Sequence, residues 1–288
     1  MNKKKFIQVI SVTLLMLFSF FYTNKSIELI RENDPIMKQI KETNTKYKVD
    51  PVNATIIGNK IIPGKSGKEI DYQKTYTKMK KYGTYNEVLT VLKEIEPAVS
   101  VDDYYDKYIV QGNAESKNVS LVFKTDTTSN LLSILNILNQ KNIPATFFVD
   151  GLLLENNTSL FETMTQNNHE LEILSYDNKY DEIYFDSALN YLSSITKREG
   201  KYCYAEYDQK EVIELCSKLK LHTIIPTIKT TTMPYKEIKD KLYNSAIISL
   251  PLSNITEEQL PAIIDYIKQQ GYTILSLEAL LSENNDEK

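Results

Sequence analysis

The segment Val119–Asp126 places three polar side chains at the end of an apolar run. Its sequence, VSLVFKTD, predicts a buried strand that ends at Lys124, Thr125 and Asp126. The carboxyl ends of strands are where α/β proteins commonly carry their chemistry. Lys124 could serve as a base only if its pKa were strongly lowered, so the strand end raises the question of whether any reaction takes place there.

Imidazole groups are scarce in this chain, which contains only His169 and His222. A serine or cysteine hydrolase needs a basic partner for its nucleophile. Neither histidine stands in a recognisable arrangement with Ser175, Ser249 or Cys203, so we do not expect a hydrolase of this kind.

Length and charge narrow the possible classes of protein. The chain has 288 residues, enough for one large core and a smaller unit. Its formal net charge is −4, and the acidic and basic residues are interleaved. A nucleic-acid partner would call for a basic surface, so we exclude nucleic acid as a partner.

The N-terminus resembles a membrane-targeting segment. Lys3, Lys4 and Lys5 precede an apolar run from Phe6 to Tyr22, which favours a cytoplasmic N-terminus and a translocated C-terminal bulk. No small-residue cleavage pattern follows the run. We therefore predict that residues 1–25 form an uncleaved signal-anchor in the cell membrane, with secretion after signal cleavage as the alternative.

The two cysteines, Cys203 and Cys216, are too few for a disulfide-based scaffold. We interpret them as two isolated thiols. Pairing outside the cytoplasm remains the alternative, because the sequence does not fix the distance between them.

Two regions that differ in their pattern of predicted helices and strands follow the anchor. Residues 26–115 predict a small α+β unit, with a helix capped by Asp34 and a second helix that begins at Asp71 and ends at Gly83. Residues 116–282 predict strands separated by helices of 10–15 residues, which favours parallel strands with helices outside. We expect a distorted (β/α) barrel of the α/β class, followed by a disordered tail at 283–288.

The second region resembles the polysaccharide deacetylase family, the NodB-homology domain of carbohydrate esterases. The segment KNIPATFFVDG at 141–151 is similar to the family's Ala-Thr-Phe-Phe-Val-x-Gly strand. SLVFKTD, NNHELEILSYDN, SAIISLPLS and the closing segment IIDYIKQQGYTILSLEALL are similar to its other motifs, in the same order. The resemblance implies the barrel fold, but function must be argued from the site.

Active members of the family remove acetyl groups from N-acetylated glycans with a divalent metal such as zinc. The resemblance implies a metal held by one aspartate and two histidines, beside a second aspartate that acts as base. The family's two aspartates fall on Lys124 and Thr125, its two metal histidines on Leu174 and Asn178, and its late catalytic histidine on Pro251. We therefore predict no metal, no cofactor and no catalysis.

A different cation site is the alternative. Asp126 lies one residue past the aligned pair, and Asp177 and Asp181 follow the altered histidine motif. A shift of the strand could bring their carboxylates together as an all-oxygen site. We interpret them instead as solvated loop residues, and Asp150 as a strand-end turn residue.

Five tyrosines near the strand ends could contact a glycan, because a tyrosine offers an apolar face and a hydroxyl. They are Tyr176, Tyr180, Tyr202, Tyr204 and Tyr207. We predict a membrane-anchored, extracytoplasmic pseudoenzyme that binds cell-wall glycan. The alternatives are a scaffold for an envelope protein, and an active deacetylase, a hydrolase of non-peptide C–N bonds, with chemistry rebuilt from other residues.

Overall fold

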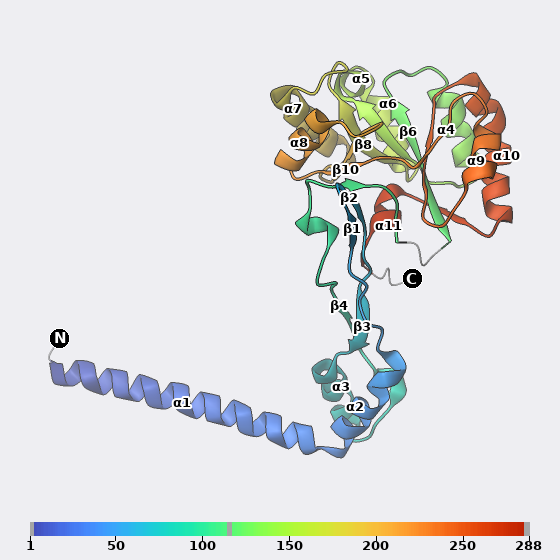
Figure 1. Cartoon of the computed structure of the whole chain (residues 1–288). Coiled ribbons are helices and arrows are strands. Elements are labelled where there is room, and N and C mark those ends of the chain that lie inside the picture. Colours follow the sequence, from blue (N-terminus) through green and yellow to red (C-terminus); the bar gives the residue numbers. More distant parts are fainter. Residues whose placement is uncertain (1–2, 114–116, 285–288) are drawn as a thin grey trace. The chain divides into compact units, whose positions relative to one another are not determined.

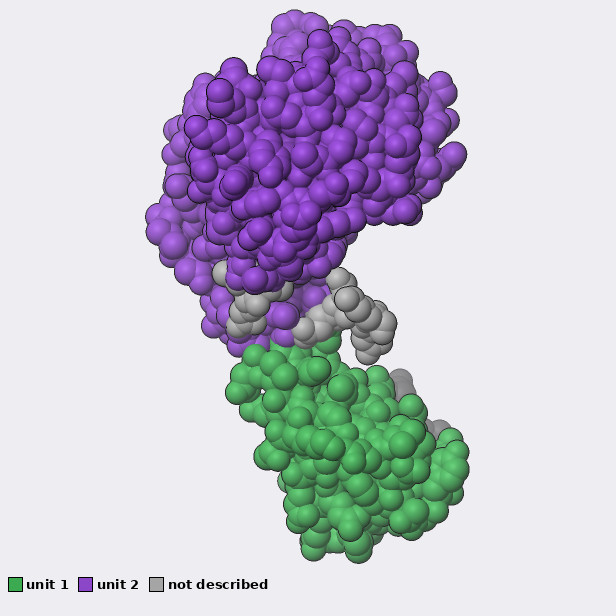
Figure 2. Space-filling model, turned by 90° about the vertical axis from the view of Figure 1, so that its right-hand side faces the viewer, with its two compact units in different colours: residues 1–50, 67–95 green, residues 51–66, 96–288 purple. Residues whose placement is uncertain are grey.

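The computed structural model describes residues 3–113 and 117–284, and the described chain forms two compact units (Figure 2). The first unit comprises residues 1–50 and 67–95, and the second comprises residues 51–66 and 96–288. The segment predicted as one α+β unit, residues 26–115, is thus divided between the two. Residues 285–288 of the predicted tail lie outside the described residues.

The first helix, α1 (Lys3–Asn33), contains one segment that is long and apolar enough to cross a membrane. This segment, Ile10–Asn33, has 24 residues, which corresponds to about 36 Å of helix. Its described side chains are almost all exposed. The helix therefore fits either an anchor or a signal sequence.

The rest of the first unit is small and follows the predicted capping signals. Helix α2 (Pro35–Tyr47) begins at Asp34, whose carboxylate accepts a hydrogen bond from the Ile36 amide, and α3 (Tyr72–Tyr82) ends at Gly83 in the left-handed conformation. These helices pack on the antiparallel pair of β3 (Gly67–Ile70) and β4 (Leu92–Ile95). The unit also contains the short helix η1 (Glu87–Leu89).

The second unit is built on one curled sheet (Figure 1). Its strands follow the order β1-β2-β5-β10-β9-β8-β7-β6-β12-β11, and β13 also pairs with β6. Apart from the antiparallel pair of β1 and β2, its strands pair in parallel. The predicted α/β class with a distorted barrel is confirmed. The strands are β1 (Thr55–Ile57), β2 (Lys60–Ile62), β5 (Tyr108–Ile109), β6 (Asn118–Thr125), β7 (Thr146–Asp150), β8 (Glu170–Ser175), β9 (Tyr202–Tyr204), β10 (His222–Ile224), β11 (Ile228–Lys229), β12 (Ile247–Leu250) and β13 (Thr273–Leu275).

The sheet also explains why the units do not divide at residue 115. Strand β2 pairs with β5, and β5 pairs with β10, so the hairpin of β1 and β2 extends the barrel sheet. Parallel pairing joins segments that are distant in sequence. Local periodicity carries no signal for such a pairing.

Helices cover the outer face of the sheet, and the two faces have separate cores. Alternate residues of β9 show the division, because Cys203 packs outside under the helices while Tyr202 and Tyr204 belong to the inner core. The other elements are η2 (Val101–Asp103), α4 (Leu131–Gln140), α5 (Gly151–Asn156), α6 (Thr158–Gln166), α7 (Glu182–Thr196), α8 (Lys210–Lys218), α9 (Pro234–Lys241), α10 (Asn254–Gln269) and α11 (Leu277–Leu281).

The interpretation of Cys203 and Cys216 as isolated thiols is wrong. They form a disulfide between β9 and α8, with their Cα atoms 6.4 Å apart. Strand β9 and helix α8 are adjacent in the fold, and this brings two residues separated by 13 positions to within bonding distance.

A buried ion pair lies near the start of β8. The fully buried Glu172 carboxylate accepts a hydrogen bond from the Arg198 guanidinium at 2.8 Å and from the backbone amides of Lys201 and Tyr202 at 2.9 and 3.1 Å. Burial nevertheless raises the pKa of Glu172 to about 7. Near pH 7 this side chain therefore gains or loses a proton inside the folded protein.

We expect this raised pKa to make the stability depend on pH. Between pH 4.5 and 7 the folded chain holds a proton on Glu172 that the unfolded chain has released, so the free energy of unfolding falls as the pH rises through this interval. Relative to wild type, the free energy of unfolding of a Glu172→Gln variant should therefore increase by about 2–3 kcal/mol between pH 5 and pH 8. Urea denaturation at the two pH values measures this difference, and a constant difference would contradict the assignment.

Candidate functional site

A small pocket opens at the carboxyl ends of β6, β8 and β9. Its volume is about 160 Å³. The ammonium of Lys124, which lines the pocket, lies 3.0 Å from a carboxylate oxygen of Glu206 and 3.8 Å from one of Asp126. The pocket is lined by Lys124, Leu174, Tyr180, Tyr204, Glu206, Tyr207 and Gln209.

The charge state of Lys124 decides whether it could act as a base. Burial acts to lower the pKa of Lys124, but the hydrogen bond and the negative charge of Glu206 outweigh it and leave the pKa raised. The amine therefore stays protonated at neutral pH. A protonated lysine cannot take a proton from water, and its charge opposes a divalent cation.

The other positions aligned with the family's catalytic residues offer no set of metal ligands. Thr125 is buried and its hydroxyl donates to the Phe123 carbonyl, and Leu174 is a buried apolar residue. Asn178 has a positive φ of 58° in the loop after β8, and Pro251 directly follows β12. Among residues 3–113 and 117–284, no group of three or more His, Cys, Asp or Glu side chains could hold a metal ion. The residues present do not fit a divalent metal.

The alternative carboxylate site does not form. Asp126 pairs with Lys124, and Asp177 lies 2.8 Å from the Lys179 ammonium. Asp181 caps helix α7 by accepting hydrogen bonds from the amides of its first turn. Each of these acids has a separate local partner, so they do not converge on one cation.

Asp150 is a buried carboxylate that fixes a loop. Its oxygens accept hydrogen bonds from the Ser175 hydroxyl at 2.6 Å, from the amides of Asp177 and Asn178 at 3.2 and 3.0 Å, and from the Leu152 amide at 3.1 Å. It thus joins the end of β7 to the loop after β8 and begins helix α5. This agrees with its interpretation as a strand-end residue.

The five predicted tyrosines do not form one group. Tyr180, Tyr204 and Tyr207 line the pocket, and the Tyr204 hydroxyl lies 2.9 Å from that of Ser249. Tyr176 does not line the pocket, and its ring stacks on that of Tyr184. Tyr202 lies at the opposite, amino-terminal end of β9 because it begins that strand.

The stack of Tyr176 on Tyr184 explains its separation from the pocket. The ring centroids are 5.3 Å apart, and the Tyr176 hydroxyl donates to Glu155.

Sequence reasoning missed two residues that line the carboxyl-end pocket, Glu206 and Gln209. Glu206 follows the end of β9 by two residues, so the strand-end rule that singled out Asp126 after β6 would have found it.

The comparison with protein families assigns the fold of the second unit. Residues 111–246 match the family model described as Polysaccharide deacetylase. This segment is a polysaccharide deacetylase domain. The resemblance seen in its sequence motifs is thereby confirmed.

Similar proteins match this domain and more of the chain. The uncharacterized protein YlxY of Bacillus subtilis (strain 168) is 23% identical over 277 residues, which cover 90% of this chain and 87% of YlxY. The crystal structure of BA3943 from Bacillus anthracis, a CE4 family pseudoenzyme, is 23% identical with a TM-score of 0.66 and covers 88% of this chain and 97% of that chain.

A further carbohydrate esterase of family 4, PdaA of Bacillus subtilis, is 20% identical with a TM-score of 0.53. This match covers 62% of this chain and 86% of that chain. The likeness to BA3943 therefore extends over more of the chain than the likeness to PdaA. At these identities both structures show a shared fold.

The hydrogen bonds of Asp150 in the polysaccharide deacetylase domain generate a stability prediction. An Asp150→Asn variant should lower the free energy of unfolding by about 2–4 kcal/mol, because one oxygen of a buried, multiply bonded carboxylate is replaced by a donor. The matched variant Asp126→Asn removes an exposed acid with one weak ion pair and should change stability by less than about 1 kcal/mol. Urea denaturation compares the two, and equal effects would remove the structural role of Asp150.

Proposed function

We propose that the protein is a membrane-anchored protein of the cell envelope whose deacetylase-like domain binds glycan without hydrolysing it. The observation that carries this proposal is the composition of the carboxyl-end pocket. Three tyrosines line it together with the Lys124–Glu206 ion pair, and Lys124 and Thr125 stand at the positions that align with the family's two aspartates.

The absence of catalysis follows from the groups that hydrolysis needs. Losing a general base costs about 10²–10⁴-fold in rate, and losing the metal removes several kcal/mol of transition-state stabilisation. BA3943, which has the same fold, is described as a pseudoenzyme, and one mutant of it as having restored enzymatic activity. Both descriptions support the proposal that this fold can be kept when catalytic activity is lost.

Glycan is the proposed ligand because of the exposed aromatic surface beside the pocket. Tyr207 is 63% exposed and lines the pocket with Tyr180 and Tyr204. A pocket of about 160 Å³ is smaller than sites that enclose small molecules, which measure about 300–1,000 Å³. The glycan would therefore lie across the exposed Tyr207 and the half-buried Tyr180, with the buried Tyr204 beneath them.

The proposed location rests on the N-terminal helix and on the disulfide. Three lysines precede the apolar segment of α1, which favours transfer of everything that follows it out of the cytoplasm. The Cys203–Cys216 disulfide suits an oxidising compartment. We propose a single-pass membrane protein with its bulk outside, and secretion after signal cleavage is the alternative.

The purified chain should release no acetate above background from N-acetylglucosamine oligomers or peptidoglycan, with or without added zinc, cobalt or nickel. A positive control is a variant that carries Lys124→Asp, Thr125→Asp, Leu174→His, Asn178→His and Pro251→His, which should bind zinc. Acetate release by the unmodified chain, lost on adding a chelator, would contradict the proposal and establish an active deacetylase.

Titration with peptidoglycan fragments tests glycan binding. Replacing Tyr207 by alanine should weaken binding about 2–10-fold, because it removes a stacking face. Tyr184→Ala is the matched control, since Tyr184 is similarly exposed but does not line the pocket. A chain that responds to no glycan would favour the alternative of a scaffold for an envelope protein.

A further inference from the structure

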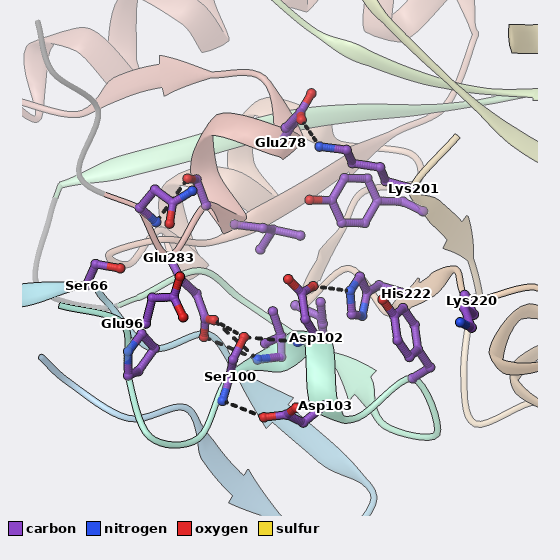
Figure 3. A pocket seen from close by; sticks show the side chains of 18 of the residues that line it. Ser66, Glu96, Ser100, Asp102, Asp103, Lys201, Lys220, His222, Glu278 and Glu283 are labelled. Carbon is purple, nitrogen blue, oxygen red and sulfur yellow. Dashed lines mark hydrogen bonds and ion pairs between the residues drawn. The ribbon is translucent and has the colours of Figure 1, made fainter. Parts of the chain in front are cut away.

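A second cavity, larger than the carboxyl-end pocket, lies at the amino-terminal ends of β9 and β10 (Figure 3). Its volume is about 810 Å³, and all of its lining residues belong to the second unit. Tyr202 lines it from β9, directly after Lys201 in the preceding loop, and His222 lines it from β10 and Glu278 from α11. Because Tyr204 of the same strand lines the carboxyl-end pocket, the two cavities lie at opposite ends of the barrel.

Tyr202 brings an unpartnered hydroxyl to this cavity. The residue is only 6% exposed and lines the cavity. Its hydroxyl forms no hydrogen bond with any residue that the structure describes, although its backbone amide donates to Glu172. The hydroxyl itself is open to the solvent of the cavity, where water would be its partner. A ligand in the cavity would take the place of that water.

A flat aromatic wall stands beside Tyr202. The ring of His222 stacks on Tyr105 with centroids 4.4 Å apart and planes 17° apart. The Nε2 atom of His222 lies 3.0 Å from a carboxylate oxygen of Asp102, which fixes the orientation of the ring (Figure 3). The wall is therefore held in place from both β10 and η2.

The cavity is strongly acidic. Six carboxylates line it against two lysines, which gives a formal charge of −4 with His222 neutral. Lys201 is already paired with Glu278. The side chains of Glu96 and Glu199 have no ionic or hydrogen-bonding partner in the described part of the chain. The carboxylates are Glu96, Asp102, Asp103, Glu199, Glu278 and Glu283.

The negative potential also acts on the buried tyrosine. Burial, followed by the charges of Glu170 and Glu172 and then by those of Glu278 and Asp102 in the cavity, raises the pKa of Tyr202 well above its ordinary value. The hydroxyl therefore keeps its proton and offers a lone pair as a hydrogen-bond acceptor. Carboxylates, a hydroxyl and aromatic faces are the groups that bind an organic cation.

We infer that this amino-end cavity is a second ligand site, which takes a small organic molecule that carries primary ammonium groups. Its volume lies within the range of about 300–1,000 Å³ for small-molecule sites. Two sources of such a ligand share this chemistry, an amino sugar without its acetyl groups and a lysine-rich peptide. The inference is independent of glycan binding at the opposite end of the barrel.

The test is calorimetric titration of the detergent-solubilised full chain at low salt with the glucosamine trisaccharide and with trilysine. At least one amine should bind, and the tri-N-acetylated trisaccharide, which lacks ammonium groups, should bind at least about 10-fold more weakly. Binding by one amine alone would identify the source. Binding of neither amine, or equal binding of the acetylated trisaccharide, would overturn the inference.

Two sets of variants locate the site. Tyr202→Phe should weaken amine binding about 2–10-fold, because it removes one hydrogen bond. A Glu96→Gln, Glu199→Gln double variant changes exposed residues and should weaken amine binding and reduce its salt dependence, even if Tyr202→Phe does not fold. Loss of amine binding in Tyr207→Ala, with both amino-end variants unaffected, would place the amine in the carboxyl-end pocket and overturn the inference.

Discussion

The alternation of side chains along the parallel strands determines what each end of the barrel can present. In a strand, every second residue faces the interior. On β9 this places Tyr202 and Tyr204 inside, one near each end, and turns Cys203 outward. On β6, the residue two positions beyond the buried Val122 is Lys124, which lines the carboxyl-end pocket. The chemistry of both ends is thus set by a few positions at fixed register.

At the carboxyl end, that register brings the Lys124 ammonium next to the Glu206 carboxylate, and no histidine lines this pocket. Lys124 and Glu206 neutralise one another at the surface, where an ion pair contributes at most about 1 kcal/mol. This pair is compatible with the fold but supplies no activated water. Asp150 shows the contrast, because its carboxylate is saturated by hydrogen bonds within the protein and has no capacity left for a reaction.

Much of the fold could be predicted from the sequence, because helical periodicity, capping residues and strand runs are local signals. Asp34 and Gly83 marked helix ends correctly, and segment 141–151 indicated the family. The parts that could not be predicted depend on contacts between distant segments. The pairing of β2 with β5, the disulfide of Cys203 and the separation of Tyr202 from Tyr204 all follow from the assembled sheet.

The disulfide lies on the outer face of the sheet, but it also bears on the inner face, where the cavities are. It ties the middle residue of β9 to helix α8, and the residues on either side of that tie are the tyrosines of the two cavities. One covalent link on the outer face of the sheet thus holds the strand whose residues line both cavities, while the cysteines line neither cavity. Reductive cleavage of this single bond would loosen the two ends of the barrel together.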